Sequence, residues 1–382
     1  MPTPVDVGVA LAQFDGTSLE HLHRRRALKA LRAFYRSPAR IGFLTGPEQS
    51  GKSDVARVFA ERTNRKAGRE AMPVLVARAT GLCGTVFQPD QLVREFALAA
   101  KVPALEHLCA PPQQVENLFG QTHIVPRLPK GSQRERTEVM CAALRNAVAY
   151  RQVDLLVVDQ IERIFSEDRP RHLVRYRYVE EIAEQTGVRM LLVGRDSLVA
   201  SVLASVQALG PPPVVRLPRY ADLREGSGYE QFRSFAQKLL DDVPGITMEP
   251  IDHQAMGRLH AKCLGCPGLL ANLVREALSD ALPAGLFRSA ILRVDDVVRK
   301  GQPATYLRAR LQAIQEGEEA IRRYVEVQPH DELILQQELG LTPRKQAPRN
   351  STRTPKWAAG GNAIHRRKVG EHTPRRIRPD SA

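Results

Sequence analysis

The sequence predicts an α/β protein whose parallel sheet is covered by helices on both faces. Short apolar segments of strand length alternate with longer helical segments along residues 39–220, as in chains that build parallel sheets. Two of the strand candidates, VDLLVV at 153–158 and VRMLLV at 188–193, are nearly continuous apolar runs, which is typical of strands buried on both faces. Beyond residue 220 the strand signal stops, and a small all-α unit is predicted from helical segments at 228–241, 251–263 and 268–282.

The individual elements follow from periodicity and from turn residues. A capping box at 17–20 predicts the start of a first helix. Leu28, Leu31 and Tyr35 then recur at helical spacing until Ser37-Pro38 ends that helix. Five prolines between residues 101 and 133 favour an irregular insertion there. The remaining elements are expected as strands at 41–44, 73–80, 153–158, 188–193 and 214–217, and as helices around 55–59, at 90–100, 135–150 and 170–186, and from Ser197.

Length and composition exclude several classes of protein. A chain of 382 residues is long enough for two or three domains, and 43% hydrophobic with 26% charged residues excludes a wholly disordered or collagen-like chain. No apolar run is long enough to span a membrane, and the first thirty residues show no secretory signal pattern. The five cysteines are too scattered for a disulfide framework. We therefore expect a cytoplasmic protein without a membrane partner.

The positive charge is concentrated near the end of the sequence. The chain has a net charge of +14, and residues 341–382 hold eleven Lys and Arg against two acidic residues. Unopposed charge in a flexible segment favours contact with a polyanion through counterion release; the alternative is an arm that folds on a protein partner. The expected division is an N-terminal helical segment (1–38), an α/β core (39–220), a helical lid (221–300), a C-terminal helical extension (301–340) and a disordered basic tail (341–382).

A phosphate-binding loop is predicted between the first strand and the helix that follows it. Residues Gly46-Pro47-Glu48-Gln49-Ser50-Gly51-Lys52-Ser53 satisfy the pattern G-x-x-x-x-G-K-[ST]. The glycines let consecutive backbone N–H groups converge on phosphates, the lysine neutralises the β- and γ-phosphates, and the serine hydroxyl ligates Mg²⁺. The preceding apolar strand and the following amphipathic helix distinguish this segment from an ordinary glycine-rich turn.

Polar residues after two further strands are candidates for the chemistry of hydrolysis. Asp159 directly follows VDLLVV, where a carboxylate can hold Mg²⁺ with Ser53. The next residue is Gln160, which can position a water but cannot accept its proton; Glu162 is the nearest glutamate. Either Glu162 acts as the base or hydrolysis is slow and ATP binding is the switch. Arg195 or Asp196, at the end of VRMLLV, is the candidate sensor of the γ-phosphate.

These segments together resemble the AAA+ ATPases, and among them most closely the TniB/TnsC-type transposition ATPases of bacterial mobile elements. The resemblance covers about residues 15–300 and includes a helix before the loop, a threonine-bearing turn after the second strand and a trailing helical lid. The basic tail beyond this range is a further point of likeness. It implies an AAA+ P-loop NTPase core that hydrolyses ATP with Mg²⁺. It further implies a homo-oligomer, a ring or a filament on double-stranded target DNA, that engages the transposase and target-selection protein of the same element.

The resemblance also points to DNA-binding residues. In assemblies of this kind the loops after the first core helix and the second strand tend to face the pore. Such residues fix register on the phosphate backbone without reading bases; the alternative is an ordinary solvated helix end. The residues concerned are Arg62, Arg65, Lys66, Arg69, Thr80 and Thr85.

The chain departs from the family pattern in the lid and in its arginines. Gly268 stands where many AAA+ lids carry an arginine that reaches the γ-phosphate, and Arg275 is a distant substitute. Together with Gln160, this keeps open an alternative function, a weakly or non-hydrolysing nucleotide-gated switch. Candidates for an arginine that acts on a neighbouring subunit are Arg163, Arg216 and Arg219, each of which is otherwise expected to be a surface charge.

The pair Cys263 and Cys266, with His260 before it, has the spacing of half a zinc site. The chain offers no second pair of this kind, so we expect ordinary buried cysteines.

Overall fold

The structure is a computed structural model, and all of its described residues lie within Met1–Gln328. The predicted capping box at 17–20 and the basic tail at 341–382 lie outside the described residues, and the division into domains stays a prediction. The described residues are 21–68, 70–79, 89–101, 110–116, 122–127, 132–165, 169–221, 226–241, 246–248, 252–281, 290–292 and 294–325.

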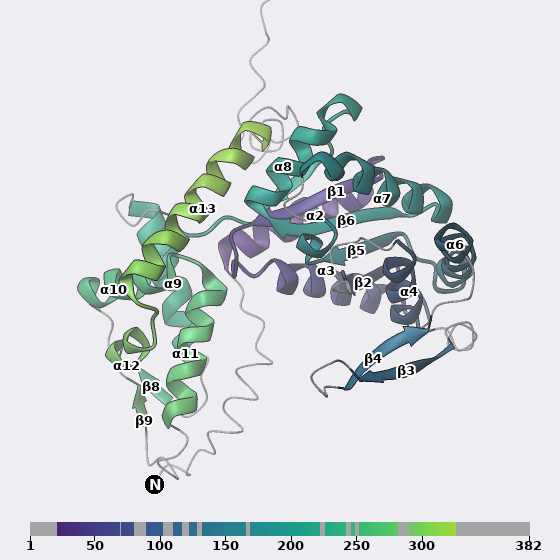
Figure 1. Cartoon of the computed structure of the whole chain (residues 1–382). Helices are drawn as coiled ribbons and strands as arrows, with labels where there is room; N and C mark the ends of the chain where they lie inside the picture. Colours follow the sequence, from purple (N-terminus) through teal and green to yellow (C-terminus); the bar gives the residue numbers. More distant parts are fainter. Residues whose placement is uncertain are drawn as a thin grey trace, which may run out of the picture. The chain divides into compact units, whose positions relative to one another are not determined.

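Five parallel strands form the central sheet in the order β2-β5-β6-β1-β7 (Figure 1). The strand that leads into the phosphate loop, β1, is an internal strand, because it pairs with β6 on one side and β7 on the other. Since all five strands are parallel, their carboxyl ends meet at one edge, where ligands bind in open α/β sheets. The strands, all five of them predicted, are β1 (Ile41–Gly46), β2 (Val74–Arg78), β5 (Leu155–Asp159), β6 (Arg189–Arg195) and β7 (Val214–Arg216).

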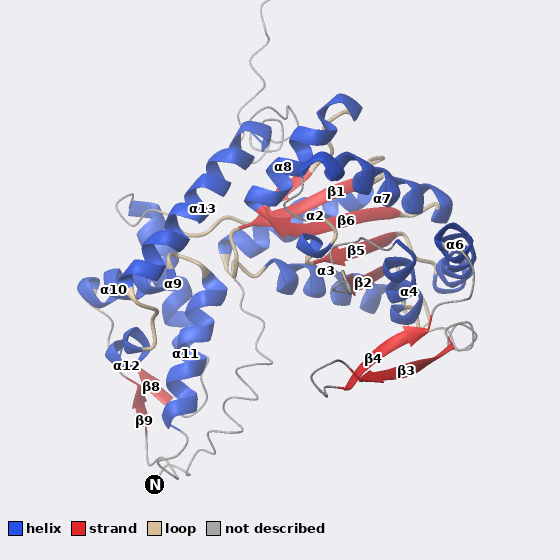
Figure 2. Ribbon diagram, viewed as in Figure 1, coloured by secondary structure: helices blue, strands red, loops and turns tan. Residues whose placement is uncertain are grey.

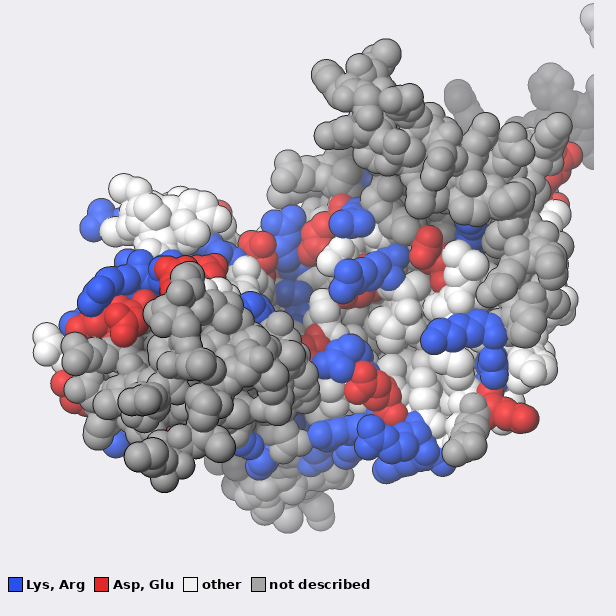
Figure 3. Space-filling view, turned by 90° about the horizontal axis from the view of Figure 1, so that it is seen from below, with Lys and Arg blue, Asp and Glu red and all other residues white. Residues whose placement is uncertain are grey.

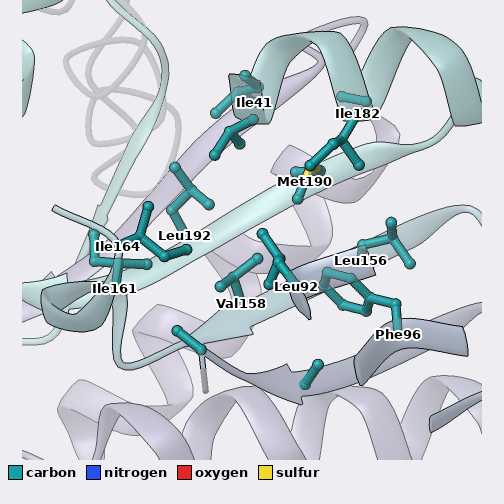
Figure 4. Packing of buried hydrophobic residues seen from close by; sticks show 14 of the residues in the cluster. Ile41, Leu92, Phe96, Leu156, Val158, Ile161, Ile164, Ile182, Met190 and Leu192 are labelled. Atoms are coloured by element: carbon teal, nitrogen blue, oxygen red, sulfur yellow. The ribbon is translucent and has the colours of Figure 1, made fainter. Parts of the chain in front are cut away.

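Helices cover both faces of this sheet (Figure 2). Side chains alternate along each strand, so Leu155 and Val157 pack against one layer while Leu156 and Val158 pack against the other (Figure 4). The first layer consists of α2 (Leu22–Arg36) and α3 (Lys52–Ala67). The second layer consists of α4 (Pro89–Ala99), α6 (Gln133–Arg151), α7 (His172–Thr186) and α8 (Asp196–Val206).

The proline-containing segment at 101–133 was wrongly expected to be irregular throughout. It contains β3 (Ala110–Glu116) and β4 (Thr122–Arg127), which pair antiparallel with a register shift between Ala110 and Gln113. In a sheet of only two strands each strand has one edge without a partner strand, and prolines are tolerated at such positions because no N–H is needed there.

The lid is mainly helical, as predicted, and also contains a short parallel pair of strands. The pair was missed because three-residue strands are too short to show an alternating pattern. The lid elements are α9 (Gly226–Asp241), β8 (Ile246–Met248), α10 (His253–Cys263), α11 (Pro267–Ala281), β9 (Ala290–Leu292) and α12 (Val294–Arg299). Short 3₁₀ helices occur in the core at η1 (Ile161–Arg163), η2 (Arg169–Arg171) and η3 (Gln207–Leu209).

A long final helix, α13 (Ala304–Val325), joins the lid to the sheet. Leu307 and Ile314 lie in the hydrophobic cluster of the lid, whereas Ile321 lies in the cluster between the sheet and the second layer of helices. These residues are seven positions apart and share one face of the helix. One face of α13 therefore packs into both hydrophobic clusters. None of the helices in the described part of the chain is both long and apolar enough to cross a membrane.

Candidate functional site

The predicted phosphate loop connects the end of β1 to the start of α3 in a tightly constrained backbone. Gly51 has φ of 95° and lies directly before the first helical residue, so a side chain would be strained there. A Cβ on Gly46 would lie 2.3 Å from the carbonyl oxygen of Leu217. Both glycines of the motif are thus required by geometry, one by its conformation and the other by a close approach of backbone.

Lys52 is held over the loop at the N-terminus of α3. Its ammonium donates to the carbonyl oxygens of Gly46 at 3.0 Å and Pro47 at 2.6 Å. Burial lowers the pKa of Lys52, and the nearby carboxylates of Asp196 and Glu162 oppose that shift. A partly desolvated cation beside a helix N-terminus is a favourable place for an anion.

The phosphate loop and the candidate catalytic residues line one cleft of about 670 Å³. This volume lies within the range of pockets that hold nucleotide-sized ligands. The lining comes from the loop, from the ends of β5 and β6 and from the start of α11. The cleft brings together the predicted site residues Glu48, Gln49, Gly51, Lys52, Ser53, Asp159, Gln160, Glu162 and Arg195.

Oxygen ligands suitable for Mg²⁺ are present in this cleft. Asp159 is the last residue of β5 and is only 5% exposed, and the backbone N–H of Gln160 donates to its Oδ1 at 3.0 Å. Ser53 lines the same cleft from the first turn of α3. A hydroxyl and a carboxylate are the hard donors that Mg²⁺ uses beside phosphate oxygens, so the residues present fit the ion.

The residues after Asp159 form a turn that places Glu162 next to the end of β6. Gln160 has φ of 62°, and η1 begins directly after it. Glu162 Oε1 accepts from the backbone N–H of Arg195 at 2.8 Å and lies 3.4 Å from Arg195 Nε. The carboxylate is therefore positioned by the strand end, in the same cleft as Lys52 and Asp159.

The structure separates the two sensor candidates at the end of β6. Arg195 lines the cleft with its side chain 49% exposed. Asp196 is buried and accepts a hydrogen bond from Thr45 Oγ1 at 2.7 Å, and burial raises the pKa of its carboxyl. Asp196 thus ties the start of α8 to β1, while Arg195 is the residue that faces the cleft.

The lid contributes the start of α11 to the cleft, and the contact explains the glycine at position 268. The backbone N–H of Gly268 donates to the carbonyl oxygen of Gln49 at 2.9 Å, and a Cβ on Gly268 would lie 2.6 Å from that oxygen. Asn272, one turn later, also lines the cleft. Arg275 donates to Asn272 Oδ1 at 2.7 Å and is not among the lining residues.

The positions of the phosphate loop and of the cleft agree with a match to a known protein family. The family model of an AAA domain matches residues 35–201, which include the phosphate loop, Asp159 and the end of β6. The matched residues are thus similar to an AAA domain. The five-stranded parallel sheet between helices and the mainly helical lid confirm the predicted fold class for the described part of the chain. None of the curated proteins matches the chain.

Three solved structures align with most of the chain at low identity. A Walker-type ATPase of Pyrococcus abyssi shares 14% identity at a TM-score of 0.43, over 79% of this chain and 75% of that chain. The Drosophila ORC bound to DNA shares 14% identity at a TM-score of 0.45, over 89% of this chain and 86% of that chain. The Aeropyrum pernix ORC1 protein in complex with DNA shares 16% identity at a TM-score of 0.46, over 84% of this chain and 72% of that chain. With TM-scores below 0.5, none of the three bears on what this chain binds.

The arginines predicted as trans-acting candidates have different positions around the AAA domain. Arg219 is 7% exposed and donates to Glu318 and to the carbonyl oxygen of Leu264, so the expectation of a surface charge was wrong for it. The sequence could not show this, because Glu318 lies 99 residues away. Arg216 lies 3.8 Å from the same carboxylate. Arg163 is exposed and lines the cleft.

Two features next to the AAA domain were missed or left open by the sequence. Arg310 of α13 forms an ion pair with Glu48 of the phosphate loop at 3.5 Å, a contact without a local sequence signal. Cys263 and Cys266 are buried, and burial raises the pKa of the Cys266 thiol to about 11, as expected for core cysteines. No cluster of three or more metal-ligating side chains occurs in the described part of the chain.

Three of the predicted DNA-binding residues are described. Arg62, Arg65 and Lys66 are exposed in the last turns of α3, at the end opposite the phosphate loop. The other three, Arg69, Thr80 and Thr85, lie outside the described residues.

Proposed function

We propose that the chain is an ATP-dependent, DNA-binding AAA+ regulator of transposition of the TniB/TnsC type. In this function it oligomerises on target DNA and engages the transposase of its element. The observation that carries the proposal is the single cleft that gathers Lys52, Ser53, Asp159 and Glu162. The proposed contacts with DNA are supported by the positive charge of the residues concerned. The transposase partner is supported by the sequence resemblance.

In the proposed function the loop binds the triphosphate of ATP. The backbone N–H groups of residues 46–53 and the ammonium of Lys52 hold the phosphate oxygens. Ser53 and Asp159 hold Mg²⁺, directly or through water, and the bound ion neutralises charge on the phosphates. Because Lys52 already lies on two loop carbonyls, its transfer to a phosphate exchanges neutral acceptors for charged ones.

Glu162 is the residue proposed to accept the proton of the attacking water. It is the cleft-lining carboxylate of the turn that follows Asp159, and the hydrogen bond from the backbone N–H of Arg195 fixes its position. Gln160 is proposed to orient the water, since an amide can donate and accept hydrogen bonds but cannot take the proton at neutral pH. Arg195 is proposed to contact the γ-phosphate, which would loosen its pair with Glu162.

Binding to double-stranded DNA is proposed for the exposed basic residues at the far end of α3 and for the basic tail. Arg62, Arg65 and Lys66 can contact phosphates without base specificity. Arg69, Thr80 and Thr85 complete the proposed set. Removal of the tail at residue 340 is expected to flatten the salt dependence of DNA binding, and an unchanged salt slope would assign the tail to a protein partner instead.

Oligomerisation through the nucleotide requires an arginine from a neighbouring subunit. Of the three candidates, Arg219 is buried and bonded to Glu318, and Arg216 pairs with the same carboxylate. The exposed Arg163 in the cleft is therefore the first candidate and Arg216 the second. Assembly on DNA as a ring or a filament is tested by sedimentation with ATP, with Arg163→Ala and Arg216→Ala compared.

A different function is favoured by two observations in the cleft. Gln160 stands where a glutamate is usual, and the close approach of Gly268 to Gln49 leaves no room for a sensing arginine at that position. Both favour a nucleotide-gated switch that binds ATP tightly and hydrolyses it slowly or not at all.

Release of inorganic phosphate, measured with and without duplex DNA, distinguishes the two functions. The regulator predicts turnover that DNA stimulates and that Lys52→Ala abolishes. The switch predicts tight ATP binding by calorimetry and no turnover in either condition. If the chain neither binds ATP nor turns it over, both functions are excluded. Co-purification with the transposase of the same element, in the presence of ATP, tests the transposition partner.

A further inference from the structure

Helices α2 and α3 form a groove on the outer side of the sheet, away from the nucleotide cleft. The lining includes Leu28 and Phe59, which give it an apolar floor, and the ring of Tyr35, which lies 6.0 Å from that of Phe59. The groove has a volume of about 180 Å³. This is smaller than pockets that hold whole nucleotides but is large enough for a phosphate group.

Four cations line this groove, two from each helix. Arg32 and Arg36 come from the last turns of α2, and Arg62 and Lys66 come from the last turns of α3. None of the described residues that line the groove is acidic. Figure 3 shows Lys and Arg side chains along the lower edge of this view, with Asp and Glu side chains among those on the rest of the face.

The acidic residues of α3 are engaged on another face. Asp54 pairs with Arg24 at 3.1 Å and with Arg57 at 2.6 Å, and Glu61 pairs with Arg57 at 2.7 Å. Both helices place two cations four residues apart on the same groove, so an anion there would meet positive charge from both helices.

The groove is separated from the nucleotide cleft by the length of α3. Lys52 and Lys66 lie fourteen residues apart on this helix, which corresponds to roughly 21 Å. The groove is therefore not an extension of the cleft. A surface of one charge sign with room for single phosphate groups fits a repetitive polyanion better than a free nucleotide.

We propose that the α2–α3 groove holds a stretch of the phosphodiester backbone of duplex DNA, with Arg32 and Arg36 of α2 as contacts additional to those of α3. This inference rests on the proposed DNA-binding function and adds the helix before the phosphate loop to the DNA-binding surface. The apolar floor supports the aliphatic stems of the arginines while their guanidinium groups face the phosphates.

The test compares two double substitutions on α2 that remove the same charge. Arg32→Gln with Arg36→Gln removes the proposed contacts, whereas Arg26→Gln with Lys29→Gln removes two exposed cations that do not line the groove. Binding to a fluorescent duplex is measured by anisotropy between about 50 and 200 mM salt, with ATP and Mg²⁺ present. Each lost phosphate contact lowers the slope of log K against log salt by about 0.9.

The expected result is weaker binding and a slope reduced by about 1.8 for the groove variant, with the control pair close to the wild type. A charge-preserving variant, Arg32→Lys with Arg36→Lys, should retain most of the slope, and thermal unfolding confirms that each variant is folded. Equal slopes for the groove and control variants would overturn the proposal that the groove contacts DNA, while leaving the DNA-binding function in place. No binding by the wild-type chain would overturn both.

Discussion

The two ends of helix α3 both gather positive charge, but in different surroundings. At the N-terminal end Lys52 is partly desolvated, lies on loop carbonyls and shares its cleft with the carboxylates of Asp159 and Glu162. At the C-terminal end Arg62 and Lys66 are exposed and line a groove without an acidic residue among its described lining.

This difference separates two kinds of anion site. A buried cation beside carboxylates suits one defined anion with its metal ion, because the low dielectric strengthens each contact and the backbone fixes the geometry. Exposed cations of one sign suit a repetitive polyanion, and salt weakens their contacts because solvent and ions reach them.

Lys52→Ala should have the largest effect and should be confined to the nucleotide end. Loss of charged hydrogen bonds to phosphate is expected to weaken ATP binding by about 100-fold or more in calorimetry. Arg57→Ala is the control on the same helix; its exposed ion pairs contribute little, so ATP affinity should change by less than about fivefold. Nucleotide-free DNA binding at the other end should be unchanged. Normal ATP affinity in Lys52→Ala would contradict the assignment of the loop.

Glu162→Gln should separate binding from turnover at the nucleotide end. Removal of the proton acceptor is expected to slow phosphate release by about 100-fold or more while ATP affinity stays near that of the wild type. Gln160→Ala, two residues away, should slow release much less. If the Gln160 substitution has the larger effect, Glu162 only positions Arg195 and is not the base.

Gly268→Ala tests whether the lid is held against the phosphate loop by close backbone contact. The added methyl would lie 2.6 Å from the Gln49 carbonyl oxygen, so we expect a loss of about 1–3 kcal/mol in the free energy of unfolding and weaker ATP binding. Gly257→Ala is the matched control in α10. Its Cβ meets open space, and it should stabilise the protein by about 0.5–1 kcal/mol. Equal behaviour of the two variants would contradict the contact.

The contrast between buried and exposed charge extends to His21, which precedes α2. Burial lowers the pKa of His21 to about 3, so the fold favours the neutral ring. The contribution of His21 to the free energy of unfolding is therefore fully present above its unfolded pKa of 6.5. It is lost as the pH drops below that value, by up to about 1.4 kcal/mol per pH unit. Urea unfolding between pH 7 and pH 5 should show this slope, and His21→Phe, which keeps the packing on Phe235, should reduce it. Equal slopes would show that His21 is not the source.

Much of the core fold could be predicted because its signals are local. The strand at 188–193 and the helix at 170–186 correspond to β6 and α7 within a few residues. Asp159 was predicted in the site because it ends an apolar strand, and parallel strands bring their carboxyl ends together.

Other parts of the site had no local signal. Asn272 lines the cleft only because α11 approaches the phosphate loop, and Arg310 reaches Glu48 from a helix more than 250 residues later in the chain. The hairpin of β3 and β4 was missed because its prolines argue against strands unless the strands lie at an edge.

The phosphate-loop motif, the strands of the sheet and the periodic helices could be predicted from local signals, because glycine conformations, turn residues and hydrophobic spacing act over a few neighbouring residues. Which charges are buried became evident from the three-dimensional arrangement alone. Arg219 and Asp196 are shielded from water, whereas Arg32 and Arg62 line an exposed groove, although all four are ordinary charged residues in the sequence. Burial depends on segments that meet across the fold, such as α13 with the end of the sheet, and no local pattern encodes such a meeting.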